Sequence, residues 1–178
     1  ELHPNTEVCS TMKCILPRTV IKIQNKDNQC FEWAILSALY PVEYVHKNYR
    51  PSKYQVHLGE VNYDEVDFPV KVTDVTKFER RNPELSINIY GWNSGMYLIQ
   101  VSKALGREID LLLLVDKEDP VKKHYVWKKD LARMLFKNSN NGRRKHPCHR
   151  YLHVFSTHGS IESHKIDCNG IGEKPQNI

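Results

Sequence analysis

The stretch that decides the predicted fold reads Asp27-Asn28-Gln29-Cys30-Phe31-Glu32-Trp33-Ala34-Ile35-Leu36-Ser37-Ala38-Leu39. A polar, turn-forming run ends at Cys30, and an apolar pattern with helical spacing begins at once. Its apolar positions share one helix face: Phe31, Ala34, Ile35, Ala38 and Leu39. Cys30 therefore lies at a predicted helix N-terminus, where the helix dipole stabilises a thiolate and lowers its pKa. This setting suits a nucleophilic cysteine, and the alternative is a buried core cysteine.

The composition is that of a soluble globular protein. The chain has 178 residues, 40% of them hydrophobic and 26% charged, which suits one domain with a small appendage. No apolar run reaches the roughly 20 residues of a membrane span, so we expect no membrane partner. We find no signal peptide pattern. Five cysteines at irregular spacing do not resemble a secreted disulfide framework, so we expect reduced thiols and a cytoplasmic or nuclear location.

The periodicity predicts an α+β chain. We expect helices over residues 30–40, 51–54 and 74–82, and a further helix after Asp130. We expect strands over residues 18–23, 86–90, 96–101, 109–115 and 124–127. The strand at 109–115 is apolar on both faces and so is predicted to lie in the middle of the sheet.

A thiol nucleophile needs a general base, and His124 is the predicted one. A histidine can hold the thiolate and protonate a leaving amine at neutral pH. A third group must fix the imidazole tautomer. Asp130 is the first candidate for this role, with Asn88 and Asp116 behind it. The alternatives are a strand-end surface histidine at 124 and a helix N-cap at Asp130, and the cap can coexist with the catalytic role.

The oxyanion of an acyl-transfer reaction also needs hydrogen-bond donors. The backbone N–H of Cys30 is one donor by position. Gln24 lies six residues earlier, a spacing that resembles that of the oxyanion glutamine in papain-like proteases. The Asp27-Asn28-Gln29 turn could instead aim backbone N–H groups into the site, and the sequence leaves both possibilities open. We expect three aromatic side chains to wall a narrow cleft: Trp33, Tyr125 and Trp127.

Over roughly residues 18–136 the chain contains, in this order, the pattern Asp27-x-x-Cys30-Phe31, an apolar helix, a strand series and His124-Tyr125. This arrangement resembles the ovarian-tumour (OTU) class of deubiquitinating cysteine proteases. The resemblance implies Cys30 as nucleophile, His124 as base and the Asp27 turn as oxyanion element. It implies a papain-like or OTU-like fold, with the nucleophile helix packed on a mostly antiparallel sheet. The implied activity is cleavage after the C-terminal Gly-Gly of ubiquitin or a ubiquitin-like protein, with no cofactor for catalysis. Asn28 replaces the glycine of the class, and Val126 stands where Asn or Asp is frequent, which leaves the third catalytic residue open.

The chain is also similar to proteins of large virus-like mobile elements in animals, often encoded with a protein-primed type B DNA polymerase. This similarity concerns where the gene comes from and does not itself supply an activity. The matching segments span nearly the whole chain: residues 25–33, 68–70, 77–79, 86–91, and His124-Tyr125-x-Trp127.

The C-terminal region has the spacing of a ββα zinc finger with one ligand replaced. It reads Cys148-x-x-Tyr151-x3-Phe155-x5-Ile161-x-x-His164-x3-Cys168, with Phe155 and Ile161 as the core positions. The predicted ligands of a structural zinc are Cys148, His164 and Cys168. Tyr151 fills the fourth position poorly, and His149 or His153 could stand in. Without metal such a small unit lacks enough core to fold alone.

We therefore predict an N-terminal extension (1–17), a cysteine protease-like domain (18–138), a basic linker (139–147), a degenerate zinc finger (148–170) and a tail (171–178). The basic residues Arg143-Arg144-Lys145 and Arg150, together with the finger, suggest a nucleic-acid partner. The competing function is a non-catalytic module that binds DNA or a polymerase. A third possibility is a protease-derived scaffold that binds its partner without cleaving it.

Overall fold

The structure is a computed structural model that describes residues 19–43, 47–93, 95–116, 119–135 and 145–168. The chain divides into two compact units, which we call unit 1 (Glu1–Asp130) and unit 2 (Leu131–Ile178). The predicted N-terminal extension, the tail and the predicted boundary at residue 138 lie outside the described residues. No described helix is long and apolar enough to cross a membrane.

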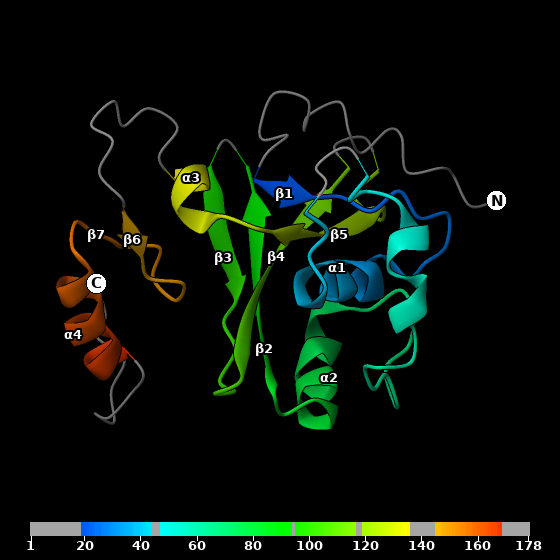
Figure 1. The fold of residues 1–178 in the computed structure, drawn as a ribbon, viewed down its shortest axis with the longest axis horizontal. Helices are drawn as coiled ribbons and strands as arrows, with labels where there is room; N and C mark the ends of the chain where they lie inside the picture. The colour runs from blue at the N-terminus through cyan, green and yellow to red at the C-terminus, as the bar shows by residue number, and fades with distance from the viewer. Residues whose placement is uncertain (1–18, 44–46, 94, 117–118, 136–144, 169–178) are drawn as a thin grey trace. The chain divides into compact units, whose positions relative to one another are not determined.

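Unit 1 contains a mixed five-stranded sheet in the order β1-β5-β4-β2-β3 (Figure 1). Parallel pairing joins β2 to β4, and the other three pairings are antiparallel. The apolar strand β4 lies at the centre, as predicted. The elements are β1 (Val20–Ile21), α1 (Cys30–Leu39), η2 (Pro51–Lys53), η3 (Gln55–His57), η4 (Val72–Asp74), α2 (Val75–Arg81), β2 (Leu85–Trp92), β3 (Met96–Gln100), β4 (Arg107–Val115) and β5 (Lys123–Lys128).

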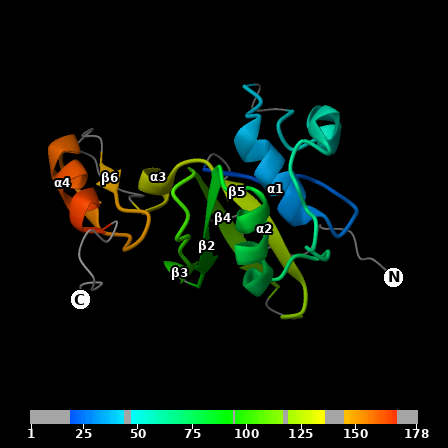
Figure 2. The ribbon, with the colours of Figure 1, turned by 90° about the horizontal axis from the view of Figure 1, so that it is seen from below.

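Helix α1 begins at Cys30 and forms the centre of the unit 1 core. Nine of its ten residues are buried, which requires cover on both sides. One side packs on β5 (Figures 1 and 2). The centre of the Phe31 ring lies 5.2 Å from that of Tyr125 and 5.1 Å from that of Phe78 in α2, and both contacts are edge-on. Buried side chains of the long α1–α2 connection join the same core: Tyr54, Val61, Val66 and Val70.

Unit 2 contains a short helix and a ββα module. The helix α3 spans Leu131–Leu135, and β6 (His146–Pro147) pairs antiparallel with β7 (Val154–Phe155) before α4 (His158–Cys168). Ile161, one of the two predicted core positions, is buried, and Phe155 is half-buried with its ring 4.8 Å from that of His164. The described residues therefore form an α+β protein whose last elements follow the ββα order expected from the spacing.

Candidate functional sites

The Cys30 thiol is buried, with 8% of the residue exposed. Burial raises the pKa of this thiol, and the nearby Asp27 carboxylate raises it further. The backbone N–H groups of Tyr125 and Phe31 act in the opposite direction but are outweighed. The expected low pKa at the helix N-terminus is therefore wrong, because the cost of burying a thiolate exceeds the stabilisation offered by the helix end.

The His124 side chain lies on the face of the sheet opposite α1. Tyr125 packs against Phe31 of α1, and successive side chains of a strand point to opposite faces. The imidazole is 2% exposed, so His124 is not a surface residue. Its Nε2 atom has no hydrogen-bond partner among the described residues. Burial, with a smaller contribution from the positive charge of Lys22, lowers the pKa of His124 to about 3.

The Cys30 thiol therefore lies beside the β5 backbone, but it does not pair with the His124 side chain. The thiol faces the backbone N–H of Tyr125, the residue that follows His124. Within the described residues the Nε2 atom of the imidazole has no hydrogen-bond partner, the thiol included. A nucleophile and its base must come within hydrogen-bond reach, although the contact can be looser without substrate. The catalytic roles of Cys30 and His124 thus stay predictions.

No hydrogen bond between Asp130 and His124 is seen among the described residues, so the role of Asp130 in orienting the ring stays a prediction. Asp130 is exposed and follows the end of β5, and residues 124–128 of that strand alone span about 13 Å. Its place directly before α3 agrees with the alternative role of helix N-cap. The two other candidates bond elsewhere, since Asn88 donates to Asp110 and Asp116 accepts from the backbone of Asp119.

The Asp27 carboxylate holds the turn before α1 in place. It accepts hydrogen bonds from Asn25 Nδ2 at 2.7 Å, from the backbone of Gln29 at 3.0 Å and from Trp33 Nε1 at 3.1 Å. The same residue therefore fixes the entry to α1 and anchors an aromatic ring. Gln24, the other predicted oxyanion residue, is exposed, and its backbone N–H donates to the carbonyl of Tyr49 at 2.9 Å.

The expected aromatic cleft is a packed core. Trp33 and Tyr125 are each 4% exposed and belong to the hydrophobic core, and Trp127 packs partly buried against it. Side chains that fill a core cannot also wall an open cleft, so this prediction is wrong for Trp33 and Tyr125. A hollow of about 630 Å³ in unit 1 lies instead between α2 and the β3–β4 connection. None of the predicted site residues lines this hollow. Its lining consists of Thr76, Glu79, Arg80, Pro83, Gln100, Val101, Lys103, Ala104 and Leu105.

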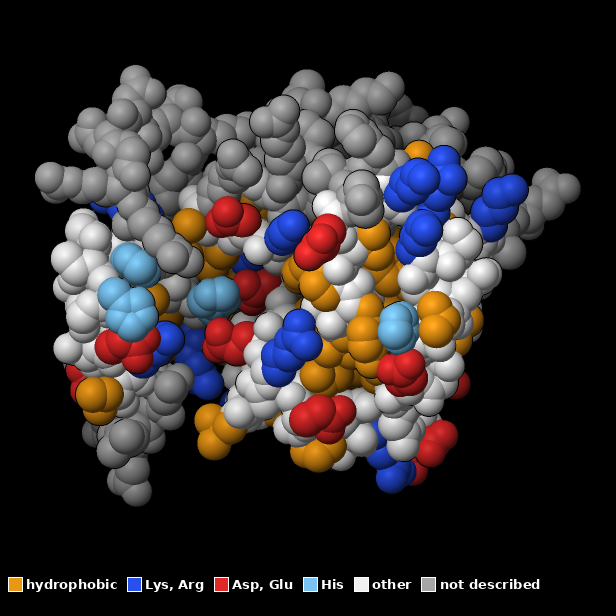
Figure 3. All heavy atoms as spheres, in the orientation of Figure 1, with side chains coloured by type: hydrophobic (Ala, Val, Ile, Leu, Met, Phe, Trp, Pro, Cys, Tyr) orange, Lys and Arg blue, Asp and Glu red, His pale blue; other side chains and the backbone are white. Residues whose placement is uncertain are grey.

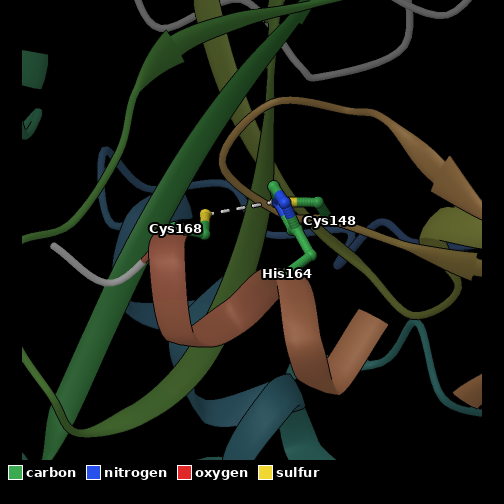
Figure 4. Close-up of side chains that lie close together, drawn as sticks. All are labelled: Cys148, His164 and Cys168. Atoms are coloured by element: carbon green, nitrogen blue, oxygen red, sulfur yellow. Dashed lines mark hydrogen bonds between the residues drawn. The ribbon is translucent and has the colours of Figure 1, made fainter. Parts of the chain in front are cut away.

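In unit 2, Cys148, His164 and Cys168 form a group that could hold a metal ion (Figure 4). Cys148 comes from the β6–β7 turn, and the other two residues lie one turn apart on α4. Their ligand atoms all lie within 4.8 Å of one another, and the two sulfur atoms are 3.5 Å apart. Two sulfurs bound to one tetrahedral zinc ion would be about 3.8 Å apart. The spacing thus suits shared coordination.

The environment of the His164 side chain also supports a metal site at this group. Its Nε2 atom is buried and has no hydrogen-bond partner within the described residues. A buried polar atom without a partner is costly, and a metal ion would satisfy it. Five of the chain's nine histidines fall between residues 146 and 164, and Figure 3 shows histidine side chains on the surface of unit 2. His149 and His153, the predicted substitutes for a fourth ligand, lie outside the three-residue group.

Sequence reasoning missed a buried charge pair on the face of the sheet opposite α1. Lys128 Nζ lies 3.0 Å from Asp110 Oδ2 and 4.2 Å from the centre of the Tyr90 ring. Asn88 Nδ2 and the Tyr90 hydroxyl donate to Asp110 Oδ1 at 3.1 and 3.2 Å. Burial lowers the pKa of Lys128, and Asp110 opposes this shift. The sign of this pair that the sequence offered was the presence of charged residues within strands that are otherwise largely apolar.

Comparisons with known proteins do not assign this chain to a family. No family model matches the chain, and no curated protein or solved structure matches it. The resemblances to OTU proteases and to mobile-element proteins therefore stay predictions from sequence motifs.

Proposed function

We propose that this chain is a binding protein whose second unit is a ββα module folded around a structural zinc ion. The observation that carries the proposal is the convergence of Cys148, His164 and Cys168, with a sulfur–sulfur distance of 3.5 Å and a buried, unpartnered Nε2. Two thiolates and an imidazole are donors that favour zinc over magnesium or calcium. Bound zinc would supply folding free energy to a unit of fewer than about 70 residues, which has too little core of its own.

The partner proposed for unit 2 is a protein rather than DNA bases. DNA-reading fingers contact bases from helix positions −1, 3 and 6. With α4 starting at His158, these positions are Thr157, Ser160 and Ser163. The hydroxyl of Thr157 accepts from the Ser160 backbone at 3.2 Å and lies 2.7 Å from the Ser160 hydroxyl. Two of the three reading positions are thus engaged in capping the helix, and none carries the arginine, lysine, asparagine or glutamine that reads bases best.

The outer surface of unit 2 agrees with a protein partner. Ile166 is 60% exposed and Tyr151 is 40% exposed, so the module presents apolar side chains to solvent. The charges of α4 are mixed and partly paired, since Lys165 bonds Glu162 at 2.9 Å. The exposed carboxylates of Glu162 and Asp167 on α4 oppose contact with a phosphate backbone.

Removing the metal is expected to unfold unit 2 and leave unit 1 folded. A chelator should make residues 145–168 sensitive to limited proteolysis, because their folding free energy comes from metal binding. Tryptophan fluorescence should stay unchanged, since all three tryptophans lie in unit 1. His164→Gln should abolish zinc retention, as measured by metal analysis of the purified protein.

His153→Gln is the matched control, because it removes a histidine of the same module outside the three-residue group. It should keep the metal. Equal zinc content in the two variants, or a purified wild-type chain that holds no zinc after loading, would contradict the proposal. Binding to duplex DNA that weakens steeply with salt would show that the partner of unit 2 is a nucleic acid and not a protein.

A second candidate function is thiol-dependent cleavage after the C-terminal tail of ubiquitin or a ubiquitin-like protein. What favours it is the position of Cys30 at the start of α1, beside the β5 backbone next to His124. Catalysis would require the thiol to lose its proton and His124 to turn toward it, whereas burial raises the pKa of Cys30.

A ubiquitin probe with a C-terminal thiol-reactive group separates the two candidates. If the chain is a binding protein, the native protein should form no adduct at Cys30 by mass spectrometry, because the buried thiol stays protonated. Iodoacetamide should label Cys30 more slowly in the native protein than in urea. A rapid ubiquitin adduct that Cys30→Ala abolishes and Cys148→Ala leaves intact would establish the hydrolase instead.

A further inference from the structure

Among the residues that the structure describes, zinc held by the Cys148–His164–Cys168 group would find three protein ligands. Zinc in structural sites is almost always four-coordinate, and a site with three protein ligands keeps an open position. The finger spacing puts Tyr151 where the fourth ligand would come from. A phenol oxygen is a poorer donor to zinc than the thiolate that a finger carries at this position.

The surroundings of Tyr151 leave this side of the site accessible. Tyr151 is 40% exposed, and its ring packs edge-on to the His164 ring with 6.0 Å between centres. The β6–β7 turn thus contributes one sulfur, that of Cys148, and its second finger position carries an aromatic ring in place of a sulfur. A ligand arriving from solvent would meet an exposed ring there instead of a filled coordination position.

The nearby histidines do not complete the group within the described residues. His153 has its ring against Phe155, with 4.8 Å between centres, and its carbonyl accepts from the Cys148 backbone at 2.7 Å. His149 lies in the β6–β7 turn and is also outside the set of ligand atoms that approach within 4.8 Å of one another.

We propose that the fourth position of this metal is filled from outside the chain, by an imidazole or thiolate donor on a partner protein. Two thiolates and a neutral imidazole already balance the two positive charges of zinc, so the site accepts a neutral imidazole at no cost in net charge. The inference rests on the proposed zinc site and deepens it, because the metal then becomes part of the binding surface.

The test uses the full chain loaded with Co²⁺, whose visible absorption reports its ligands. Imidazole is added as the probe, and the spectrum is followed to saturation. The wild-type chain should give a saturable spectral shift at one imidazole per metal. Tyr151→Cys should supply the fourth ligand from the chain, give a spectrum typical of three thiolates, and abolish the shift.

Tyr151→Phe serves as the matched control, since it keeps the ring and lacks the hydroxyl, and it should respond to imidazole as the wild type does. Cobalt binding without any imidazole shift would mean that the chain closes its own site, and would overturn this inference while leaving the metal site intact. An equal shift in Tyr151→Cys would mean displacement of a protein ligand and would also overturn it. Absence of cobalt binding would overturn the metal site itself.

Discussion

Acidification from pH 7 toward pH 3 is expected to remove about 5 kcal/mol of stability from unit 1 through His124 alone. The folded protein holds the pKa of His124 at about 3, whereas an unfolded histidine titrates near 6.5. Each unit of difference corresponds to about 1.4 kcal/mol. The cause is burial: the imidazole is 2% exposed, and the positive Lys22 adds to the cost of charging it.

The sign follows from proton binding. Between pH 6.5 and pH 3 the unfolded chain carries the His124 proton and the folded chain does not, so stability rises with pH. The contribution is complete above about pH 6.5 and is lost progressively below it. Glu32 acts in the opposite direction, because burial raises the pKa of its carboxyl and folding is then favoured by acid.

Urea unfolding followed by tryptophan fluorescence measures this effect for unit 1 without interference from unit 2, which contains no tryptophan. The unfolding free energy should decline between pH 6.5 and pH 4.5 in the wild type, and the decline should be smaller in His124→Gln. The same slope in both proteins would assign the effect to other groups. It would also remove the argument that burial holds His124 neutral.

The parts of the fold that periodicity encodes could be predicted. The start of α1 at Cys30 follows from the change from a polar turn to an apolar helical pattern, and the structure begins the helix there. The central place of β4 follows from its apolar character on both faces. The ββα order follows from the spacing between Cys148 and Cys168, because that spacing reflects the geometry of the ligands.

The candidate catalytic site was harder to predict, because it depends on which way side chains face. Alternation shows that His124 and Tyr125 point to opposite faces, but not which of them points toward α1. In the structure the Tyr125 side chain points toward α1, because its ring contacts Phe31. The pKa of Cys30 could not be predicted either, since the helix N-terminus is visible in the sequence and the depth of burial is not.

The Asp110–Lys128 pair was hidden for a related reason. The two residues come from β4 and β5, and they lie one step beyond the paired residues Leu111 and Trp127. Only the strand register brings them opposite each other, and a shift by one residue would send each side chain to the other face. No local pattern in the sequence fixes that register.

Asp110→Ala is expected to destabilise unit 1 by about 3–5 kcal/mol, the usual result of leaving one member of a buried ion pair without its partner. Lys128 has a side chain with no exposed surface, so water cannot replace the lost carboxylate. Asn88 and Tyr90 would also lose the acceptor that both now use. Urea unfolding at pH 7, followed by tryptophan fluorescence, measures the loss.

A second substitution separates the charge from the hydrogen bonds. Asp110→Asn with Lys128→Met keeps an oxygen acceptor for Asn88 and Tyr90 and removes the buried charge, so the double variant should regain most of the lost stability. Asp110→Ala should also lose less stability at pH 10 than at pH 7. Without its carboxylate the pKa of Lys128 falls further, because burial already lowers it, and a neutral lysine is buried at less cost. A loss independent of pH, unrelieved in the double variant, would mean that Asp110 acts through packing and hydrogen bonds and that its charge contributes little.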